Sequence, residues 1–227
     1  EVRERIEQIR HGNVPDRYKK IKNAIIPTCW KYEKLGPYLI QHHEVSEYSD
    51  QYPVLTSSRK GIFFQSEYYN KEIASEDNTG YNVVPRGYFT YRHMSDDEVF
   101  RFNINTIADK GIVSTLYPVF TTTKEINDIF LCEILNGGSD FRRYAMLQKQ
   151  GGSRTYMYFD KLRSLVLPLP PLSEQQRIAE ILATQNKVIE LKEKLLAEKQ
   201  RQKKYLMQQL LTGKKRLPGF EGKWKKE

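Results

Sequence analysis

The sequence predicts an α+β fold in which a mixed α/β domain is followed by one long helix. Runs of β-branched and aromatic residues, punctuated by glycine, proline and serine, fill residues 52–123 and indicate strands. Helical periodicity follows in residues 124–147, and strands that precede helices along a chain are typical of α+β domains. Residues 173–212 then contain neither proline nor glycine, which favours a single uninterrupted helix.

The first expected element is a short amphipathic helix in residues 1–12. Apolar residues follow helical spacing in this segment, and Gly12 ends the pattern. Residues 13–29 contain two prolines and are expected to form an extended lead-in, because proline disfavours helix in the residue before it. The folded domain is expected to begin near Trp30.

The strand-rich region contains seven segments with the composition of strands. They are residues 52–56, 62–64, 81–84, 88–91, 100–104, 112–117 and 119–120. The polar stretch 57–61 predicts a turn between the first two segments, and residues 85–87 predict another.

Two helices are expected after these strands. Thr123 is the predicted N-cap of the first, at residues 124–135, and Ser139 is the predicted N-cap of the second, which continues to Leu147. The first helix has one apolar face, formed by Ile126, Ile129, Phe130 and Ile134. Three short elements then complete the domain: a strand at 155–159, a turn at 160–164 and a strand at 165–169.

The long helix is predicted for residues 173–212, a length of about 60 Å. Ser173 is its expected N-cap, Gln176 completes a capping box, and Gly213 is the expected end. Apolar residues recur on a seven-residue repeat, which predicts a coiled coil. The predicted contact residues are Ile178, Ile181, Leu182, Val188, Ile189, Leu195, Leu196, Leu206 and Leu210. The alternative is that this face packs on the helix's own domain.

The net charge of the chain is +9, and it is concentrated at the two ends. Residues 173–227 hold 14 basic and 7 acidic residues, residues 1–22 hold 7 and 4, and residues 23–172 hold 16 and 17. This distribution suggests a polyanionic partner for the chain as a whole. A solvated coiled-coil flank would explain the basic helix equally well.

These patterns divide the chain into four parts. They are an N-terminal helix and lead-in (1–22), a mixed domain (23–172), the long helix (173–212) and a linker toward a possible second domain (213–227). The two cysteines lack metal-binding spacing, which favours a reduced, cytoplasmic protein. No apolar run approaches about 18 residues, so no membrane span is predicted.

Motifs for catalysis are missing from the sequence. There is no Asn-Pro-Pro-aromatic box for methylating an exocyclic amine, and no Gly-x4-Gly-Lys-Ser/Thr phosphate loop. His42 and His43 are adjacent and therefore point in different directions, so no metal site is predicted. The sequence therefore favours a binding protein over an enzyme.

Four segments carry a resemblance to one known family. Residues 168–179, Pro-Leu-Pro-Pro-Leu-Ser-Glu-Gln-Gln-Arg-Ile-Ala, resemble the conserved region of specificity (S) subunits of type I restriction-modification enzymes. Residues 210–220 resemble the linker by which such subunits pass to their next domain. Residues 111–120 resemble a stretch of their target recognition domains, and residues 14–30 resemble their N-terminal lead-in.

The resemblance implies a non-catalytic, DNA-binding subunit without a cofactor of its own. Its target recognition domain would read one part of a split site in double-stranded DNA, and its long helix would pair antiparallel with another. Its implied partners are methyltransferase subunits, which bind S-adenosylmethionine for DNA methylation, and a motor-nuclease subunit of the restriction system. Family members have two such halves and this sequence has one, so it is either a truncated form or a half-subunit, and as a half-subunit we expect it to form a homodimer. The alternative is a coiled-coil assembly protein whose globular domain binds another protein.

DNA recognition requires Arg, Lys, Asn, Gln and Ser side chains on exposed loops. Three segments of the recognition domain supply them. The candidate DNA-binding residues are Ser57, Ser58, Arg59, Lys60, Gln65, Arg92, His93, Gln150, Gly152, Ser153 and Arg154. For each of them the alternative is a solvated turn.

Overall fold

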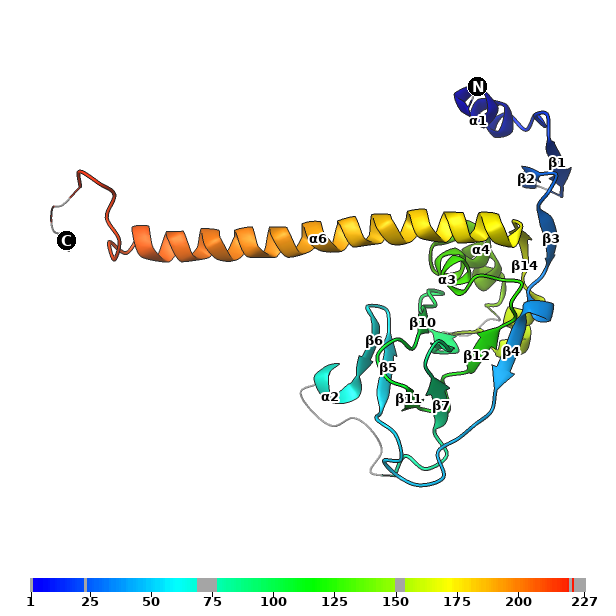
Figure 1. Cartoon of the computed structure of the whole chain (residues 1–227), viewed down its shortest axis with the longest axis horizontal. Helices are drawn as coiled ribbons and strands as arrows, with labels where there is room; N and C mark the ends of the chain where they lie inside the picture. The colour runs from blue at the N-terminus through cyan, green and yellow to red at the C-terminus, as the bar shows by residue number, and fades with distance from the viewer. Residues whose placement is uncertain (1, 23, 69–76, 150–153, 221, 223–227) are drawn as a thin grey trace. The chain divides into compact units, whose positions relative to one another are not determined.

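The computed structural model describes residues 2–22, 24–68, 77–149, 154–220 and 222. The chain divides into two compact units, Glu1–Ala179 and Glu180–Glu227. The first unit contains all the strands and the shorter helices, and the second contains most of one long helix (Figure 1). The predicted α+β class and the long C-terminal helix are therefore confirmed.

Strands dominate the first part of the chain. In order, the elements are α1 (Val2–Arg10), β1 (Tyr18–Ile21), β2 (Ala24–Pro27), β3 (Lys31–Lys34), the 3-10 turn η1 (Gly36–Tyr38), β4 (Leu39–His42), β5 (Leu55–Ser58), β6 (Gly61–Phe64), α2 (Gln65–Tyr68), β7 (Asn82–Pro85), β8 (Phe89–Tyr91), β9 (Met94–Ser95), β10 (Phe102–Ile104), β11 (Lys110–Val113) and β12 (Val119–Thr122).

Helices dominate the second part. The elements are α3 (Asp128–Gly137), α4 (Ser139–Leu147), β13 (Thr155–Tyr156), α5 (Phe159–Ser164), β14 (Val166–Leu169) and α6 (Leu172–Leu210). No helix among the described residues is long and apolar enough to cross a membrane.

A four-stranded antiparallel sheet with the order β10-β8-β12-β4 lies at the centre of the first unit. Phe120 of β12 stands opposite Phe89 of β8, and their rings stack with centroids 4.8 Å apart. The remaining strands form two-stranded antiparallel pairs: β1 with β2, β3 with β14, β5 with β6, β7 with β11, and β9 with β13.

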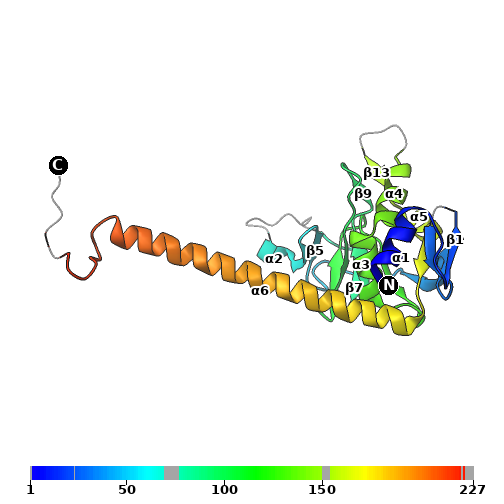
Figure 2. The same ribbon diagram turned by 90° about the horizontal axis from the view of Figure 1, so that it is seen from above.

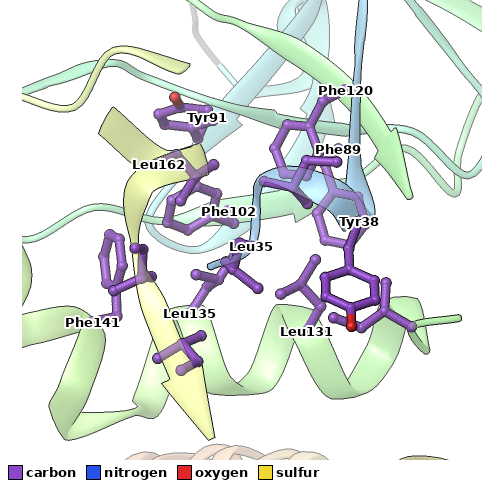
Figure 3. Packing of buried hydrophobic residues seen from close by; sticks show 14 of the residues in the cluster. Leu35, Tyr38, Phe89, Tyr91, Phe102, Phe120, Leu131, Leu135, Phe141 and Leu162 are labelled. Atoms are coloured by element: carbon purple, nitrogen blue, oxygen red, sulfur yellow. The ribbon is translucent and has the colours of Figure 1, made fainter. Parts of the chain in front are cut away.

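The main core forms where α3, α4 and α5 cover this sheet. Tyr91 and Phe102 pack against each other with ring centroids 4.5 Å apart, and Phe141 of α4 meets Phe102 edge-on (Figure 3). The buried hydroxyl of Tyr91 donates a hydrogen bond to the carbonyl of Met157 at 2.9 Å, and burial raises its pKa. Aromatic pairs of this geometry add stability beyond the area that they bury.

The predicted boundaries of the helix at 124–135 are wrong, and its predicted apolar face is confirmed only in part. Helix α3 begins at Asp128, and the Asn127 side chain caps it by accepting a hydrogen bond from the Phe130 backbone N–H. Thr123 is not the cap, because its Oγ1 accepts no hydrogen bond from the described residues and the helix starts only at Asp128. Phe130 is buried and Ile134 packs against the main core, as predicted, whereas Ile129 is 47% exposed. Leu131 and Leu135 complete the buried face, and Ile126 is buried but precedes the helix.

The start of the long helix also differs from the prediction. The carbonyl of Pro171 accepts hydrogen bonds from the N–H groups of Glu174 and Gln175, so Ser173 lies inside the first turn and is not the N-cap. The Gln175 side chain is buried. Its Oε1 accepts from the Asn127 N–H at 2.8 Å, and its Nε2 donates to the Pro170 carbonyl at 2.9 Å.

Several other local predictions need correction. The lead-in at 13–29 contains the hairpin β1–β2, because Ile21 and Ala24 can pair across a short turn. The strand expected at 112–117 ends at Val113, and a turn closed by the Tyr117 N–H and the Ser114 carbonyl follows. The expected turn at 160–164 is helix α5, which buries the side chains of Phe159 and Leu162.

Candidate nucleic-acid interface

Arg59 and Lys60 form the two-residue turn of the β5–β6 hairpin, so the predicted turn at 57–61 is narrower than expected. Ser57 is buried. Its hydroxyl donates to the Thr90 carbonyl at 3.3 Å and accepts from the Asn103 side chain at 2.8 Å. The expectation that Ser57 lies on an exposed loop is therefore wrong, because strand β5 directs it into the domain.

Ser58 closes the hairpin turn. Its hydroxyl donates to the Gly61 carbonyl and accepts from the Lys60 backbone N–H, both at 3.1 Å. Gly61 adopts a φ of 131°, a backbone conformation that residues other than glycine rarely adopt. The hydrogen bonds of Ser58 before the turn and the backbone conformation of Gly61 after it thus fix the turn that presents Arg59 and Lys60 on the surface.

Arg59 forms a bidentate ion pair with Asp97, in the loop between β9 and β10. Its Nη1 lies 2.8 Å from Oδ2 of Asp97, and its Nη2 contacts Oδ1. The hydroxyl of Ser95 also donates to Asp97, at 2.9 Å. The guanidinium of Arg59, assisted by Ser95, lowers the pKa of the Asp97 carboxyl from 3.8 to about 2.

Asp97 belongs to an acidic triplet, which consists of Asp96, Asp97 and Glu98. Asp96 accepts from the Nε of Arg154 at 2.8 Å, and Glu98 contacts the Nζ of Lys149 at 2.6 Å. Three consecutive carboxylates therefore bind three cations from three segments of the chain: the β5–β6 turn, the segment after α4 and the residue before β13. Figure 2 shows β9, which precedes the triplet, beside its partner strand β13. The triplet brings Arg59 and Arg154 to the same side of the domain.

Acid titration of Asp97 is a direct test of this ion pair. A pKa lowered by folding stabilises the folded state fully above the unfolded value near 3.8, and the contribution is lost as the pH falls through about 2. We expect the side-chain carboxyl NMR signal of Asp97 to titrate near pH 2. In Arg59→Ala the midpoint should rise toward 3.8, whereas a midpoint that does not move would contradict the pair. Lys60→Ala is the matched control, because Lys60 is not bonded to Asp97.

Arg92 and His93 lie between β8 and β9, but they have different surroundings. Arg92 lines a cavity together with Ser57, Ser58 and Arg59. The His93 ring stacks on Tyr158 with centroids 5.1 Å apart, and its Nδ1 lies 2.6 Å from the Leu116 carbonyl oxygen. His93 is therefore engaged within the domain, whereas Arg92 faces the cavity.

The remaining candidate residues are dispersed or outside the described residues. Gln65 begins α2, donates its backbone N–H to the Val54 carbonyl and does not line that cavity. Gln150, Gly152 and Ser153 lie outside the described residues. Sequence reasoning missed the acidic triplet and Arg101, which lines the same cavity as Arg92. The run of three acidic residues at 96–98 was the available signal.

The apolar stripe of α6 is exposed within the chain. Seven of the predicted contact residues have exposed fractions of 37–60%. They are Ile181, Leu182, Val188, Ile189, Leu195, Leu196 and Leu206, all in the second unit. Leu210 is half-buried, and Ile178, in the first unit, packs against the main core. Contiguous exposed apolar residues of this kind are typical of protein–protein interaction surfaces.

Comparisons with known proteins point to one family. Residues 63–200 match the family model described as the type I restriction modification DNA specificity domain. A solved chain from a study of complex assembly and conformational transition of the type I R-M system shares 15% identity with a TM-score of 0.55, over 90% of this chain and 49% of that chain. This likeness supports the fold.

Two crystal structures are also similar. The HsdS subunit from Thermoanaerobacter tengcongensis shares 16% identity with a TM-score of 0.47, over 92% of this chain and 51% of that one. The type I restriction-modification S subunit from M. genitalium shares 14% identity with a TM-score of 0.49, over 84% and 47%. This chain thus spans about half the length of the solved chains that it matches.

Proposed function

Because this chain belongs to the family of type I restriction modification DNA specificity domains, we propose that it binds double-stranded DNA at a defined sequence and directs partner subunits there. The observation that carries this proposal is the extent of the family match. Residues 63–200 include the last two residues of β6, the acidic triplet and most of α6. The match therefore spans both the recognition domain and the helix.

The basic side chains around the acidic triplet support DNA contact. Arg59, Arg154 and Lys149 all retain exposed side chains while paired with carboxylates. Exposed ion pairs of this kind contribute little stability, typically about 0–1 kcal/mol. A phosphate, which Arg and Lys side chains bind through the same charge-assisted hydrogen bonds, can therefore replace the carboxylate in each pair at little cost.

We infer that the partners are methyltransferase subunits and a motor-nuclease subunit. The proposal rests on the family and on the similar solved chain from a study of assembly of the type I R-M system. In this proposal the chain itself performs no catalysis. The methyltransferase subunits bind S-adenosylmethionine and modify the site that this chain selects.

The exposed stripe of α6 supports a further part of the proposal, a homodimer in which two α6 helices pair antiparallel. A two-fold pair presents two identical recognition domains in opposite orientation. Each domain then reads the same short sequence on opposite strands, and the complete target is an interrupted palindrome. The spacer between the half-sites is set by the paired helices and not by base contacts.

Replacing Ile189 with glutamate should dissociate this dimer. Ile189 lies in the middle of the stripe, and a carboxylate placed in a coiled-coil seam would be buried without a partner. We expect light scattering to give a dimer for the wild-type chain and a monomer for Ile189→Glu at micromolar concentration. Ala183→Glu, which lies on the opposite side of the helix by its spacing, should remain dimeric. A monomeric wild-type chain would refute the homodimer.

Methylation mapping tests the proposed function as a whole. Cells that carry this gene with its methyltransferase partner should acquire methylation at one interrupted palindrome. An asymmetric site for the chain acting alone would rule out the homodimer. A protein-binding assembly function would instead give no sequence-dependent methylation, and the purified chain would show no salt-sensitive preference for one duplex sequence.

A further inference from the structure

A cavity of about 180 Å³ opens beside the β5–β6 hairpin. It is lined by strand β5, by the segments on both sides of β9 and by Tyr117. A single water molecule needs only about 10–15 Å³ of such space, so the cavity can admit a larger polar group. Three of its lining residues are arginines, namely Arg59, Arg92 and Arg101.

Charge is not balanced within this cavity. Asp96 is its only acidic lining residue among the described residues, and it is paired with Arg154. Arg59 is likewise paired, with Asp97. In the described parts of the chain, the exposed side chains of Arg92 and Arg101 form no ion pair or hydrogen bond. Two guanidinium groups therefore face one cavity without a counter-charge.

A buried hydroxyl at the same cavity also has no partner. Thr56 lines the cavity and is 9% exposed, and its Oγ1 makes no hydrogen bond with the described residues. Buried polar groups are nearly always hydrogen-bonded in folded proteins, so an orphaned hydroxyl at a cavity indicates a missing partner. A hydroxyl can donate to an anionic oxygen, as guanidinium groups do.

We propose that this cavity binds a backbone phosphate of nucleic acid, with Arg92 and Arg101 supplying the charge and Thr56 a hydroxyl donor. The proposal rests on the proposed DNA-binding function and adds a defined subsite to it. Guanidinium groups match the geometry of phosphate oxygens and bind them in a bidentate manner. Because phosphates are the same in every sequence, this subsite positions the domain on the duplex without reading bases.

The test uses the full chain and two DNA duplexes, one with the methylated site and one unrelated. Arg92→Ala and Arg101→Ala should each weaken binding to both duplexes several-fold and by the same factor. Each substitution should also reduce the slope of log affinity against log salt concentration, and the double variant should reduce it by about 0.9, the contribution of the one phosphate that both arginines contact. Thr56→Val should weaken binding with no change in slope, because it removes a hydroxyl and not a charge.

Two further variants complete the design. Arg92→Lys should preserve the salt slope, since the charge remains. Arg142→Ala is the matched control, because Arg142 is an exposed arginine of the same domain that does not line the cavity, and it should bind like the wild-type chain. Unchanged affinity and slope in both cavity variants would overturn the proposal, as would a loss confined to the methylated-site duplex. A wild-type chain that bound neither duplex would refute the proposed function itself.

Discussion

Replacing Leu131 with alanine is expected to lower the free energy of unfolding of the recognition domain by about 2–5 kcal/mol. Leu131 is 0% exposed and lies on α3 within the main core, next to the sheet (Figure 3). Alanine keeps the helix but leaves a cavity, and the close-packed neighbours collapse only partly into it. Domains of this kind have total stabilities of about 5–15 kcal/mol, so the loss is a large share. The shift of the urea midpoint measures it.

Ile129→Ala is the matched control for that substitution. Ile129 lies on the same helix two positions earlier, and the sequence pattern alone places it on the buried face. Because its side chain is 47% exposed, we expect the free energy of unfolding to change by no more than about 0.5 kcal/mol. Equal losses for the two variants would show that α3 presents a different face to the core.

Lengthening α6 by one heptad between Glu190 and Lys204 should widen the spacer of the DNA target by about three base pairs. Seven helical residues add about 10.5 Å, and duplex DNA rises about 3.4 Å per base pair. The heptad preserves the phase of the apolar stripe, so the proposed dimer should still form. Methylation mapping of the lengthened chain should return the same two half-sites around a longer spacer.

An insertion of two residues at the same place provides the contrast. Two residues turn the helix by about 200°, so the stripe on one side of the insertion would face away from its partner helix. We expect this variant to dimerise weakly and to give little methylation. If the heptad insertion changed the half-sites themselves, the spacer would not be set by the helix, and the proposed arrangement would be wrong.

Long periodic patterns in this sequence predict structure well, because many residues independently favour the same secondary structure. The sequence predicts the 39-residue helix α6 to within two residues at each end, since its repeat extends over four heptads, from Leu182 to Leu210, without proline or glycine. The start of α3 is predicted wrongly, because it depends on which single residue caps the helix. Asn127 and Thr123 are both suitable caps, and tertiary contacts made by Tyr38 and Gln175 select Asn127.

The candidate site was predictable only in part. The sequence identified the exposed turn at Arg59 and the basic residue Arg92, because such residues tend to lie on loops. It did not reveal that Arg59 meets Asp97 across 38 positions, or that Arg154 meets Asp96 across 58. Ion pairs between distant segments depend on how the strands are arranged, and local pattern carries no information on that arrangement.

The Trp30 indole N–H donates a hydrogen bond of 3.0 Å to the Glu174 carboxylate, and the two residues are 144 positions apart in the sequence. Strand β3 likewise has β14 as its partner, from the last strand of the domain. At synthesis rates of about 5–20 residues per second, the ribosome needs roughly 7–29 seconds to synthesise the residues from Trp30 to Glu174. During that interval the nascent chain carries an open strand edge with nothing to pair it. The domain can complete its fold only after its final segment has emerged, so a nascent chain stalled before β14 would be a substrate for chaperones or proteases.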